Sequence, residues 1–520
     1  MRIGIDVGGT NTDAVLMDGV RVLAEVKTST TPDVTSGIVA AMRSLVDQSG
    51  VGSERIQAVM IGTTHFTNAV VEAKRLMPTA VLRLGLPATG ALPPLVAWPQ
   101  RLRAAIGHNV YLCHGGHEFD GREIAPLDRD ELRRAAADIG AKGIRSVAIS
   151  SVFSPVNAAF EEEAAALLSE ELPGVVISLS HEIGRIGLLE RENATVMNAC
   201  LRELATHIVA AFRAALAELG ITAPMYLSQN DGTLMSVDYA ERYPVATFAS
   251  GPTNSMRGAA LLSGEENCAV VDIGGTTSDV GVLQHGFPRE AALSVEIGGV
   301  RTNFRMPDVL SLGLGGGSLV RGDGPGLTIG PDSVGYELTS RALVFGGDTL
   351  TASDIAVAAG RASFGDPAAV RQLPRSLVDA VLALAERMIA ETVDRMKTSA
   401  EPTPVVVVGG GSVLLGDRLA GASRLVRPDH FAVANAIGAA IAQVGGEVER
   451  VFSLDQLSRE AALEQAKGEA IDKAIAAGAN ASSVRIVDVE DIPLPYIPGN
   501  ATRIKVKAVG DLELGRHDHA

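Results

Sequence analysis

The sequence predicts an α/β protein with a mixed sheet and a duplicated domain core. Along most of its 520 residues, short apolar runs rich in β-branched residues alternate with patterns of helical period, which favours an α/β architecture. A strand–glycine turn motif also occurs twice, as IDVGGTNTD in residues 5–13 and as VDIGGTTSD in residues 271–279. Each copy is followed by a second strand and a hairpin turn. Two such matches in register indicate a duplicated core rather than two unrelated tight turns.

The first copy predicts a strand over residues 3–7, then strands over 15–17 and 20–23 joined at the hairpin signal Asp18-Gly19. A helix over residues 34–47 follows. The pattern then continues to about residue 220 with strands over 58–62, 80–84, 146–150 and 175–179 and helices over 129–139, 158–171 and 193–220.

The second copy predicts strands over residues 269–273 and 280–283, with a turn at His285-Gly286. The elements after it are a glycine-rich loop over 313–335, helices over 352–360 and 377–396, a strand over 404–408 and an apolar helix over 432–444. The composition shifts near residue 450, where a charged helix over 452–476 precedes strands over 483–491 and 502–509. We therefore expect three parts: residues 1–265, residues 266–450, and a small α+β appendage over residues 451–520.

Composition excludes several classes of protein. Lys and Arg number 45 and Asp and Glu number 61, which gives a net charge of −16, and an acidic surface disfavours nucleic acid as a partner. The three cysteines lie far apart, which excludes a disulfide framework and a cysteine zinc site and fits a reducing cytoplasm. No apolar stretch of about 18 residues occurs without glycine or charge, and the N-terminus lacks a signal-peptide pattern. We therefore expect a cytoplasmic chain with no membrane span.

The repeated motif has the residue types of an anion-binding turn. Asp6 and Asp272 each end an apolar strand, and carboxylates at such positions suit Mg²⁺, usually through retained waters. The glycines that follow let the backbone turn tightly and bring its N–H groups close to an anion. The glycines and the hydroxyl and amide side chains are Gly8, Gly9, Thr10, Asn11 and Thr12 in the first copy and Gly274, Gly275, Thr276 and Thr277 in the second. Two such hairpins facing each other would clasp a polyphosphate.

Other phosphate-binding motifs are absent from the sequence. It contains no G-x-x-x-x-G-K-[ST], and no G-x-G-x-x-G follows the first strand, so neither a P-loop nor a dinucleotide fingerprint is present. The repeated hairpins, together with a third strand–glycine turn at Gly409, Gly410, Gly411 and Ser412, resemble the actin, sugar-kinase and heat-shock ATPase superfold. That resemblance implies duplicated ribonuclease-H-like ATPase domains flanking a nucleotide cleft, with the third turn against adenosine.

A longer set of motifs is more specific. In chain order these are IGIDVGGTNTDAVL, GTTHFTNAV, GLLERENATVMNA, SQNDGTLMS, FASGPTNSMRGA, VVDIGGTTSDVGVL and SLGLGGGSL. Over roughly residues 1–445 they resemble the hydantoinase A / 5-oxoprolinase family. The resemblance places Gly315 and Gly316 near the phosphates and implies catalytic roles for Asp6, Asp272, Thr10 and Thr276.

The activity that the resemblance implies is ATP- and Mg²⁺-dependent opening of a cyclic amide such as a hydantoin, 5-oxoproline or another lactam. It also implies a B-type partner subunit and a homo- or hetero-oligomer, and related carboxylases use the same phosphorylation on an enolate. The chain departs from the long family members, which typically read H-G-T-T where this chain has Ile61 before Gly62, and its C-terminus is shorter. A small-molecule kinase and a regulatory ATP-binding subunit therefore stay open as alternatives.

Several further residues are candidates for substrate contact, each with a simpler structural interpretation. The candidates are Thr63, Thr64, His65, Asn68, Glu190, Arg191, Asn230 and Asp231. Thr and Asn also cap helices, a charged pair also starts a helix, and Asn-Asp before Gly also forms a turn. His114, His117 and Glu118 have a spacing that a metal would accept, although a solvated loop has the same pattern.

Overall fold

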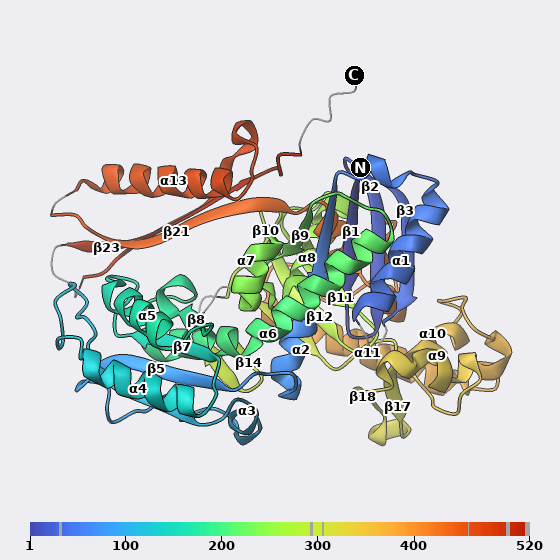
Figure 1. Ribbon diagram of the computed structural model, residues 1–520. Helices are drawn as coiled ribbons and strands as arrows, with labels where there is room; N and C mark the ends of the chain where they lie inside the picture. The colour runs from blue at the N-terminus through green and yellow to red at the C-terminus, as the bar shows by residue number, and fades with distance from the viewer. Residues whose placement is uncertain (31–33, 292–294, 304–305, 456, 496–499, 515–520) are drawn as a thin grey trace.

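The computed structural model describes the chain except for residues 31–33, 292–294, 304–305, 456, 496–499 and 515–520 (Figure 1). Its largest sheet has nine strands in the order β22-β23-β21-β10-β9-β4-β1-β2-β3. The bounds are β1 (Arg2–Val7), β2 (Asn11–Asp18), β3 (Arg21–Ser29), β4 (Ala58–Thr63), β9 (Met225–Ser228), β10 (Thr233–Ser236), β21 (Gln443–Ser453), β22 (Arg485–Pro493) and β23 (Ala501–Gly510). β1 pairs antiparallel with β2 and parallel with β4, so this is the predicted mixed sheet.

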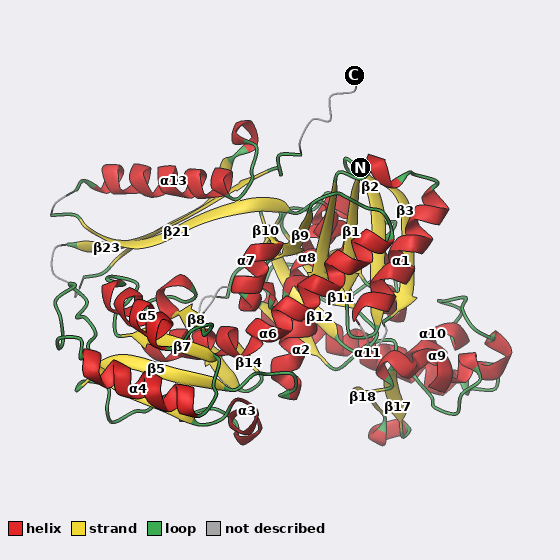
Figure 2. Cartoon of the chain, viewed as in Figure 1, coloured by secondary structure: helices red, strands yellow, loops and turns green. Residues whose placement is uncertain are grey.

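Helices cover both faces of this sheet (Figure 2). Side chains alternate along a strand, so Ile3 and Ile5 of β1 enter the core formed with α1 (Val34–Ser49) and α6 (Leu188–Glu218). Gly4, between them, faces α12 (Ala434–Ala440), where a Cβ atom would lie 2.1 Å from the Ala436 carbonyl oxygen. Glycine is therefore required at this position, because α12 packs directly on the strand backbone.

The second sheet repeats the first hairpin. It contains β11 (Cys268–Ile273), β12 (Ser278–Gln284), β13 (Phe287–Pro288), β16 (Val309–Leu312), β19 (Thr403–Val408) and β20 (Ala422–Val426). Asp272 pairs with Asp279 across β11 and β12, just as Asp6 pairs with Asp13 across β1 and β2. β11 also pairs in parallel with β19, as β1 does with β4. The duplicated core that the sequence predicts is confirmed.

A third, fully parallel sheet forms a separate lobe (Figure 1). Its strands are β5 (Thr79–Leu86), β6 (Asn109–His114), β7 (Ser146–Ser151) and β8 (Val176–Leu179), and its helices are α3 (Gln100–Ile106), α4 (Arg129–Ala141) and α5 (Ala159–Glu171). Arg83 of β5 forms a buried two-point ion pair with Glu192 of α6, with distances of 2.7 and 2.6 Å. A buried pair of this kind is costly to break and fixes the lobe against α6.

The remaining elements connect these sheets or cover them. They are α2 (His65–Glu72), α7 (Val237–Arg242), α8 (Ser250–Ser263), β14 (Val295–Ile297), β15 (Val300–Thr302), α9 (Leu338–Arg341), α10 (Ala352–Ala358) and α11 (Arg375–Met396). The loop predicted over residues 313–335 instead contains a short hairpin, β17 (Ser318–Arg321) and β18 (Thr328–Ser333). Its many glycines hide the strand pattern, because they carry no side chain with a periodicity to read.

The C-terminal region differs most from the sequence-based expectation. The helix predicted over 432–444 ends at Ala440 and the chain enters β21 at Gln443, so the boundary expected near residue 450 lies inside a strand. Gly445 and Gly446 are poor helix formers, and a Cβ atom on Gly446 would lie 2.2 Å from the Ala470 carbonyl oxygen. The charged helix predicted from 452 is α13 (Arg459–Ala476), which starts where Ser458 caps it. It packs on β21 and β23, which extend the first sheet (Figure 1).

No helix among the described residues is both long enough and apolar enough to span a lipid bilayer.

Candidate active site

The two repeated turns meet across the gap between the first and second sheets. In each turn the first glycine N–H donates to the carbonyl three residues on: Gly8 to Asn11 at 3.0 Å and Gly274 to Thr277 at 2.9 Å. The hydroxyl oxygens of Thr10 and Thr276 lie 3.2 Å apart. The two hairpins therefore face each other with their amides and hydroxyls directed at one space.

That space is a cavity of about 630 Å³, within the size range of small-molecule and cofactor sites. All three glycine turns contribute to its wall. The predicted residues that line it are Gly8, Gly9, Thr10, Asn11, Gly274, Gly275, Thr276, Thr277, Gly316, Gly409, Gly410, Gly411 and Asp272. Thr12 and Ser412 are fully buried, and the predicted nucleotide-site residues that are not part of the cavity wall are Asp6, Thr12, Gly315 and Ser412. The fold thus brings together segments from opposite ends of the chain.

Close backbone contacts hold the turns in this arrangement. Gly316 and Gly317 donate their N–H groups to the carbonyls of Gly274 and Gly275 at 2.9 and 2.7 Å. A Cβ atom on Gly315 would lie 2.6 Å from the Thr276 nitrogen, so only glycine fits there. Gly409 has φ +82°, and a Cβ atom on it would lie 2.2 Å from Asp272 Oδ1. The third turn therefore needs glycine both for its conformation and for its contact with the carboxylate.

Two other glycines are open toward the cavity. A Cβ atom on Gly9 would meet no other atom within 4 Å, and the nearest atom to one on Gly410 would be Lys27 Cε at 3.7 Å. The structure itself does not require glycine at these positions. A ligand that approaches the backbone closely would nonetheless require glycine here.

An acidic cluster lies behind the turns. One amide nitrogen, Asn435 Nδ2, donates to both Asp6 and Asp13 at 3.0 and 2.9 Å, and Lys27 Nζ lies 2.6 Å from the other oxygen of Asp13. Asp272 accepts from Ser255 Oγ at 2.5 Å. Burial, together with the charges of Asp13 and Asp272, raises the pKa of Asp6 to about 7.

Burial raises the pKa of the neighbouring carboxyls too. It raises the pKa of Asp272, and it raises that of Asp279 to about 6. Among the described residues that line the cavity, Lys27 is the single Lys or Arg. The cluster therefore holds more negative than positive charge, which a bound cation would offset.

These residues fit Mg²⁺. Asp6 Oδ1 is buried and accepts no hydrogen bond from a described residue, and carboxylate oxygens are the ligands that Mg²⁺ prefers. Asp6 and Asp272 belong to opposite halves of the repeat, and Asp272 lines the cavity between the turns. The donor set thus has the right chemistry for a cation shared with a polyphosphate.

The other end of the cavity is apolar. Phe345 and Phe364 both line it, with ring centroids 5.9 Å apart and planes 11° from parallel. Leu338, Val413 and Leu414 complete this end. An apolar end beside amide-rich turns matches a molecule with an aromatic base and a phosphate chain.

Sequence reasoning missed several residues of this cavity. They are Lys27, Ser255, Leu338, Phe345, Ser353, Phe364 and Asn435. None of them belongs to a glycine turn. Each is brought in by an element whose pairing the sequence does not reveal, such as α12, which carries Asn435 onto the first sheet.

The predicted substrate-side residues divide into separate groups. Thr64 and Asn68, at the start of α2, line the nucleotide-sized cavity. Thr63 bonds to His65 Nδ1 at 2.7 Å, and burial lowers the pKa of His65 to about 4, so its imidazole is neutral at physiological pH. Neither Thr63 nor His65 is part of the cavity wall.

Glu190 and Arg191 lie elsewhere, on α6. Glu190 is 4.0 Å from Arg301. Arg191 is buried and donates to the Ser180 hydroxyl and to the carbonyls of Ser151, Arg185 and Ile186. Neither residue lines the cavity between the hairpins, and the contacts of Arg191 connect α6 to the parallel-sheet lobe.

Asn230 and Asp231 form the turn between β9 and β10 and line a second cavity, of about 700 Å³. Asp231 lies 2.9 Å from Lys507 of β23. Burial alone would raise the pKa of Asp231, but Lys507 and the hydrogen bonds from Thr233 lower it to about 2. The Asp231 carboxylate is therefore charged at physiological pH.

The candidate metal ligands His114, His117 and Glu118 do not form one group in the structure. His114 lies with Asp128 and Glu131, and its Nδ1 is 2.9 Å from Glu131 Oε1. His117 is buried with its ring 4.4 Å from that of Phe160. Asp128 also caps α4 by accepting from two backbone N–H groups. These hydrogen bonds account for the group without a metal ion.

Comparison with known proteins decides the family. The model of the hydantoinase/oxoprolinase N-terminal region matches residues 2–172, and the hydantoinase/oxoprolinase model matches residues 191–366. The chain belongs to the hydantoinase/oxoprolinase family. Both repeated hairpins fall inside the matched ranges, whereas the third glycine turn and Asn435 lie beyond them.

Relatives within this family include subunits of larger enzymes. The chain is 28% identical to caprolactamase subunit alpha of Pseudomonas jessenii over 468 residues, 84% of this chain and 65% of that one. It is 28% identical to acetophenone carboxylase gamma subunit of Aromatoleum aromaticum over 396 residues, 69% of this chain and 53% of that one. The chain thus spans less than two thirds of the length of these curated relatives.

A solved structure shows the same fold. The crystal structure of ATP-dependent caprolactamase from Pseudomonas jessenii superposes with a TM-score of 0.78 at 21% identity, covering 99% of this hydantoinase/oxoprolinase chain and 88% of that one. At this level of identity the match establishes the fold, including the C-terminal strands that complete the first sheet.

Proposed function

We propose that this chain binds ATP with Mg²⁺ between its two hairpins and phosphorylates the amide oxygen of a small cyclic amide, such as a hydantoin, 5-oxoproline or another lactam, so that the ring opens. The observation that carries the proposal is the 3.2 Å approach of Thr10 and Thr276 across the cavity. Family membership and the ATP-dependent relative support the same nucleotide.

Each wall of the cavity has a task in this proposal. The N–H groups around Gly9 and Gly275 and the hydroxyls of Thr10 and Thr276 would hold the phosphate chain from two sides. Phe345 and Phe364 would take the adenine base. Asp6 and Asp272 would hold Mg²⁺, which when bound offsets charge on the phosphoryl group during transfer.

The chemistry follows from the low reactivity of an unstrained amide. The amide oxygen attacks the γ-phosphorus of ATP, a new P–O bond forms, and the bond to the ADP oxygen breaks. Water then adds at the activated ring carbon. The ring C–N bond breaks and the nitrogen takes up a proton, and hydrolysis of the remaining C–O–P linkage releases phosphate. The net reaction consumes one ATP and two water molecules, one that adds at the ring carbon and one that hydrolyses the C–O–P linkage: lactam, ATP and two waters give the amino acid, ADP and phosphate.

The same site supports a second chemistry. One relative of this chain is a carboxylase subunit of equal identity, and an enolate oxygen can attack the γ-phosphorus of ATP in the same geometry as an amide oxygen. A stable phosphorylated product would instead indicate a small-molecule kinase, and nucleotide binding without turnover would indicate a regulatory subunit.

We also propose that the chain works in the cytoplasm as part of an oligomer with a B-type subunit. Both curated relatives are named as subunits, and the three cysteines are free and buried, as expected in a reducing compartment. In this proposal, residues 1–265 and 266–450 supply the two halves of the nucleotide cleft.

The test measures ADP release and product mass with Mg–ATP and a panel of hydantoin, 5-oxoproline and lactams, for the chain alone and with a B-type subunit. We expect cyclic-amide-dependent ADP release that falls at least 100-fold in Asp6→Asn and Asp272→Asn, the range for loss of a principal charge-stabilising group. Asp323→Asn, on an exposed turn, is the matched control. Full turnover in both cleft variants would overturn the proposal.

A further inference from the structure

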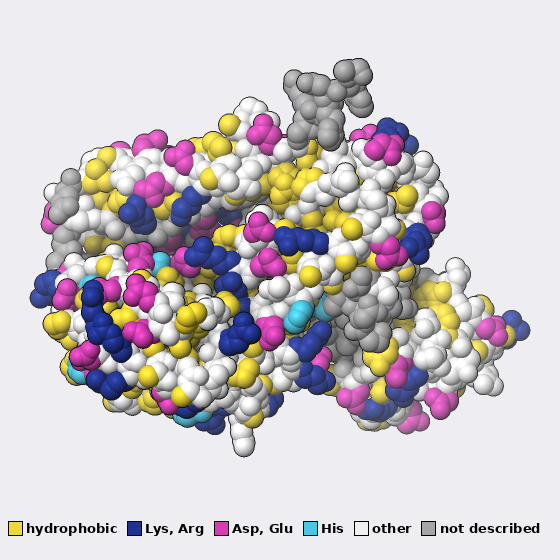
Figure 3. Space-filling model, viewed as in Figure 1, with side chains coloured by type: hydrophobic (Ala, Val, Ile, Leu, Met, Phe, Trp, Pro, Cys, Tyr) yellow, Lys and Arg dark blue, Asp and Glu magenta, His cyan; other side chains and the backbone are white. Residues whose placement is uncertain are grey.

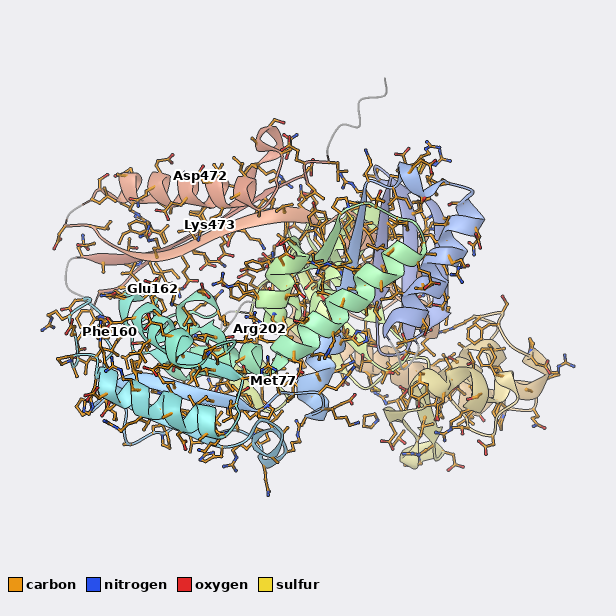
Figure 4. The ribbon with its side chains drawn as sticks, viewed as in Figure 1. Met77, Phe160, Glu162, Arg202, Asp472 and Lys473 are labelled. Carbon is orange, nitrogen blue, oxygen red and sulfur yellow. The ribbon has the colours of Figure 1, made fainter. Side chains whose placement is uncertain are left out.

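The second cavity is built from four parts of the chain. Its walls come from the β9–β10 turn, from α7, from residues 182–185 after β8, and from the layer of β21, β23 and α13. Lys473, labelled in Figure 4, extends from α13 toward β21, where its ammonium donates to the Glu447 carbonyl at 2.9 Å. Figure 3 shows the molecule hollowed between this layer and the lobe that carries α4 and α5.

The charged side chains around the second cavity already have protein partners. The pairs are Asp231 with Lys507 (2.9 Å), Glu182 with Arg242 (2.7 Å) and Arg185 with Glu449 (3.3 Å). The cavity therefore presents little free charge to a ligand, and an ionic ligand would have to break an existing pair. A neutral ligand fits better.

Asn230 contributes a polar group that has no protein partner. Its side chain lines the cavity, the residue is 8% exposed, and its carboxamide makes no hydrogen bond with any described residue. Its backbone is fixed, because Asn230 N donates to the Ala246 carbonyl at 2.7 Å and its own carbonyl accepts from Thr253 Oγ1 at 2.9 Å. The carboxamide atoms are not enclosed by protein but lie on the cavity wall, where they are available to a ligand.

The chemistry of this side chain defines its complement. A carboxamide presents an N–H donor and a C=O acceptor side by side, and it pairs at two points with a group that presents the reverse order. The cis amide of a ring has its C=O and N–H on the same edge. The apolar side chains of Met235, Val245 and Ala246 would surround the methylene groups of such a ring.

α8 separates this cavity from the nucleotide cavity. Thr253 holds the backbone of Asn230 on one side, and Ser255, two residues later, donates to Asp272 on the other. Among the residues that the structure describes, none lines both cavities. A ligand in the second cavity is thus bound away from the phosphates.

We propose that the second cavity is an accessory binding site for a neutral cyclic amide, held at two points by the Asn230 carboxamide. The choice of a cyclic amide rests on the proposed function, whereas the site itself rests on the Asn230 carboxamide, which lines the cavity without a hydrogen bond to any described residue.

The test is calorimetric titration of hydantoin and of ε-caprolactam into the full chain without nucleotide. Asn230→Leu keeps the volume and removes both hydrogen-bonding groups, and we expect it to weaken binding at least tenfold. Because Asn230 has no internal side-chain partner to lose, the variant is expected to keep or raise the melting temperature. A melting temperature that falls by several degrees would mean that the amide has a structural role and would overturn the inference.

A second pair of variants tests the location. Ala476→Phe places a ring at the wall contributed by α13, and we expect it to block binding, whereas Ala461→Phe, exposed at the start of the same helix, is expected to bind as the native chain does. Binding that persists in both Asn230→Leu and Ala476→Phe overturns the inference, and so does an absence of binding to the native chain. Cyclic-amide-dependent ADP release, abolished by Asp272→Asn, tests the proposed function separately from either result.

Discussion

Thr10 and Thr276, 266 positions apart in the chain, bring their hydroxyl oxygens to within 3.2 Å of each other. This contact joins the two copies of the repeated turn at the place where a phosphate chain would pass. The relationship makes the two threonines interdependent.

Replacing these threonines singly and together measures that dependence. Thr10→Val and Thr276→Val each remove a hydroxyl and keep the shape, and we expect each to lower ATP turnover at least tenfold. Because the hydroxyls contact each other, the double variant is expected to cost less than the two single effects combined, with a coupling of about 0.5–1.5 kcal/mol. Thr206→Val, exposed on α6, is the control. Strict additivity in the kinetics would contradict a shared site.

The open glycines give a prediction that separates binding from folding. A methyl group on Gly9 meets no protein atom within 4 Å, so Gly9→Ala is expected to leave the free energy of unfolding within about 0.5 kcal/mol of the native value. The same methyl group would occupy space that the phosphates need, and we expect nucleotide affinity to fall at least tenfold. Gly326→Ala, equally unobstructed but on the β17–β18 turn, should change neither quantity.

The opposite pattern is expected at Gly315. A methyl group there lies 2.6 Å from backbone atoms of the second turn, so Gly315→Ala must lower the melting temperature as well as turnover. An unchanged melting temperature in Gly315→Ala would show that the two segments do not pack in solution as described.

The raised pKa of Asp6 predicts a pH dependence of stability. Its carboxyl has an ordinary pKa of 3.8 and one of about 7 in the folded chain, so between these values the folded state binds more protons than the unfolded state. The free energy of unfolding therefore falls as pH rises through this window and levels off above about pH 7. At about 1.4 kcal/mol per pH unit, protonation of Asp6 accounts for a total change of about 4 kcal/mol.

Urea unfolding across this pH range, in the presence of EDTA, checks the sign. Asp6→Asn is expected to have a flatter profile than the native chain, whereas Asp18→Asn, exposed at the end of β2, should follow the native one. Added Mg²⁺ is expected to restore stability near neutral pH, because it favours the charged carboxylates. An identical slope in the native chain and in Asp6→Asn would contradict the assigned burial.

Lys27 offers a test of charge balance in the same cluster. Its side chain is 34% exposed, whereas that of its partner Asp13 is 4% exposed. Lys27→Met leaves the buried carboxylate without its cation, and we expect a loss of about 1–3 kcal/mol in the free energy of unfolding, less than for a fully buried pair. Adding Asp13→Asn should recover most of this stability but not ATP turnover. Recovery of both stability and ATP turnover would show that Lys27 has no role in the proposed site.

The sequence predicts the hairpins well because the hydrophobic periodicity of the strands and the glycines of the turns are both local signals. Asp18-Gly19 and the GGT turns specify their own geometry, and the repeat shows which two turns correspond. Lys27 lies opposite Asp13 in the β2–β3 hairpin, but no glycine motif marks it as part of the site. Asn435 gives no such signal, because its place in the site depends on how α12 packs against distant strands. The same reason applies to the C-terminal strands. Their alternating pattern is visible in the sequence, but the pairing of β21 with β10 is not.

The pairing of β21 with β10 also constrains the order in which the chain acquires its structure. A ribosome makes β10 before the whole of the second sheet and β21 after it, so this edge of β10 has no partner while residues 237–442 are made. An uncovered strand edge is a template for pairing with other chains. The nascent first sheet is therefore open to such pairing until the last strands of the chain arrive.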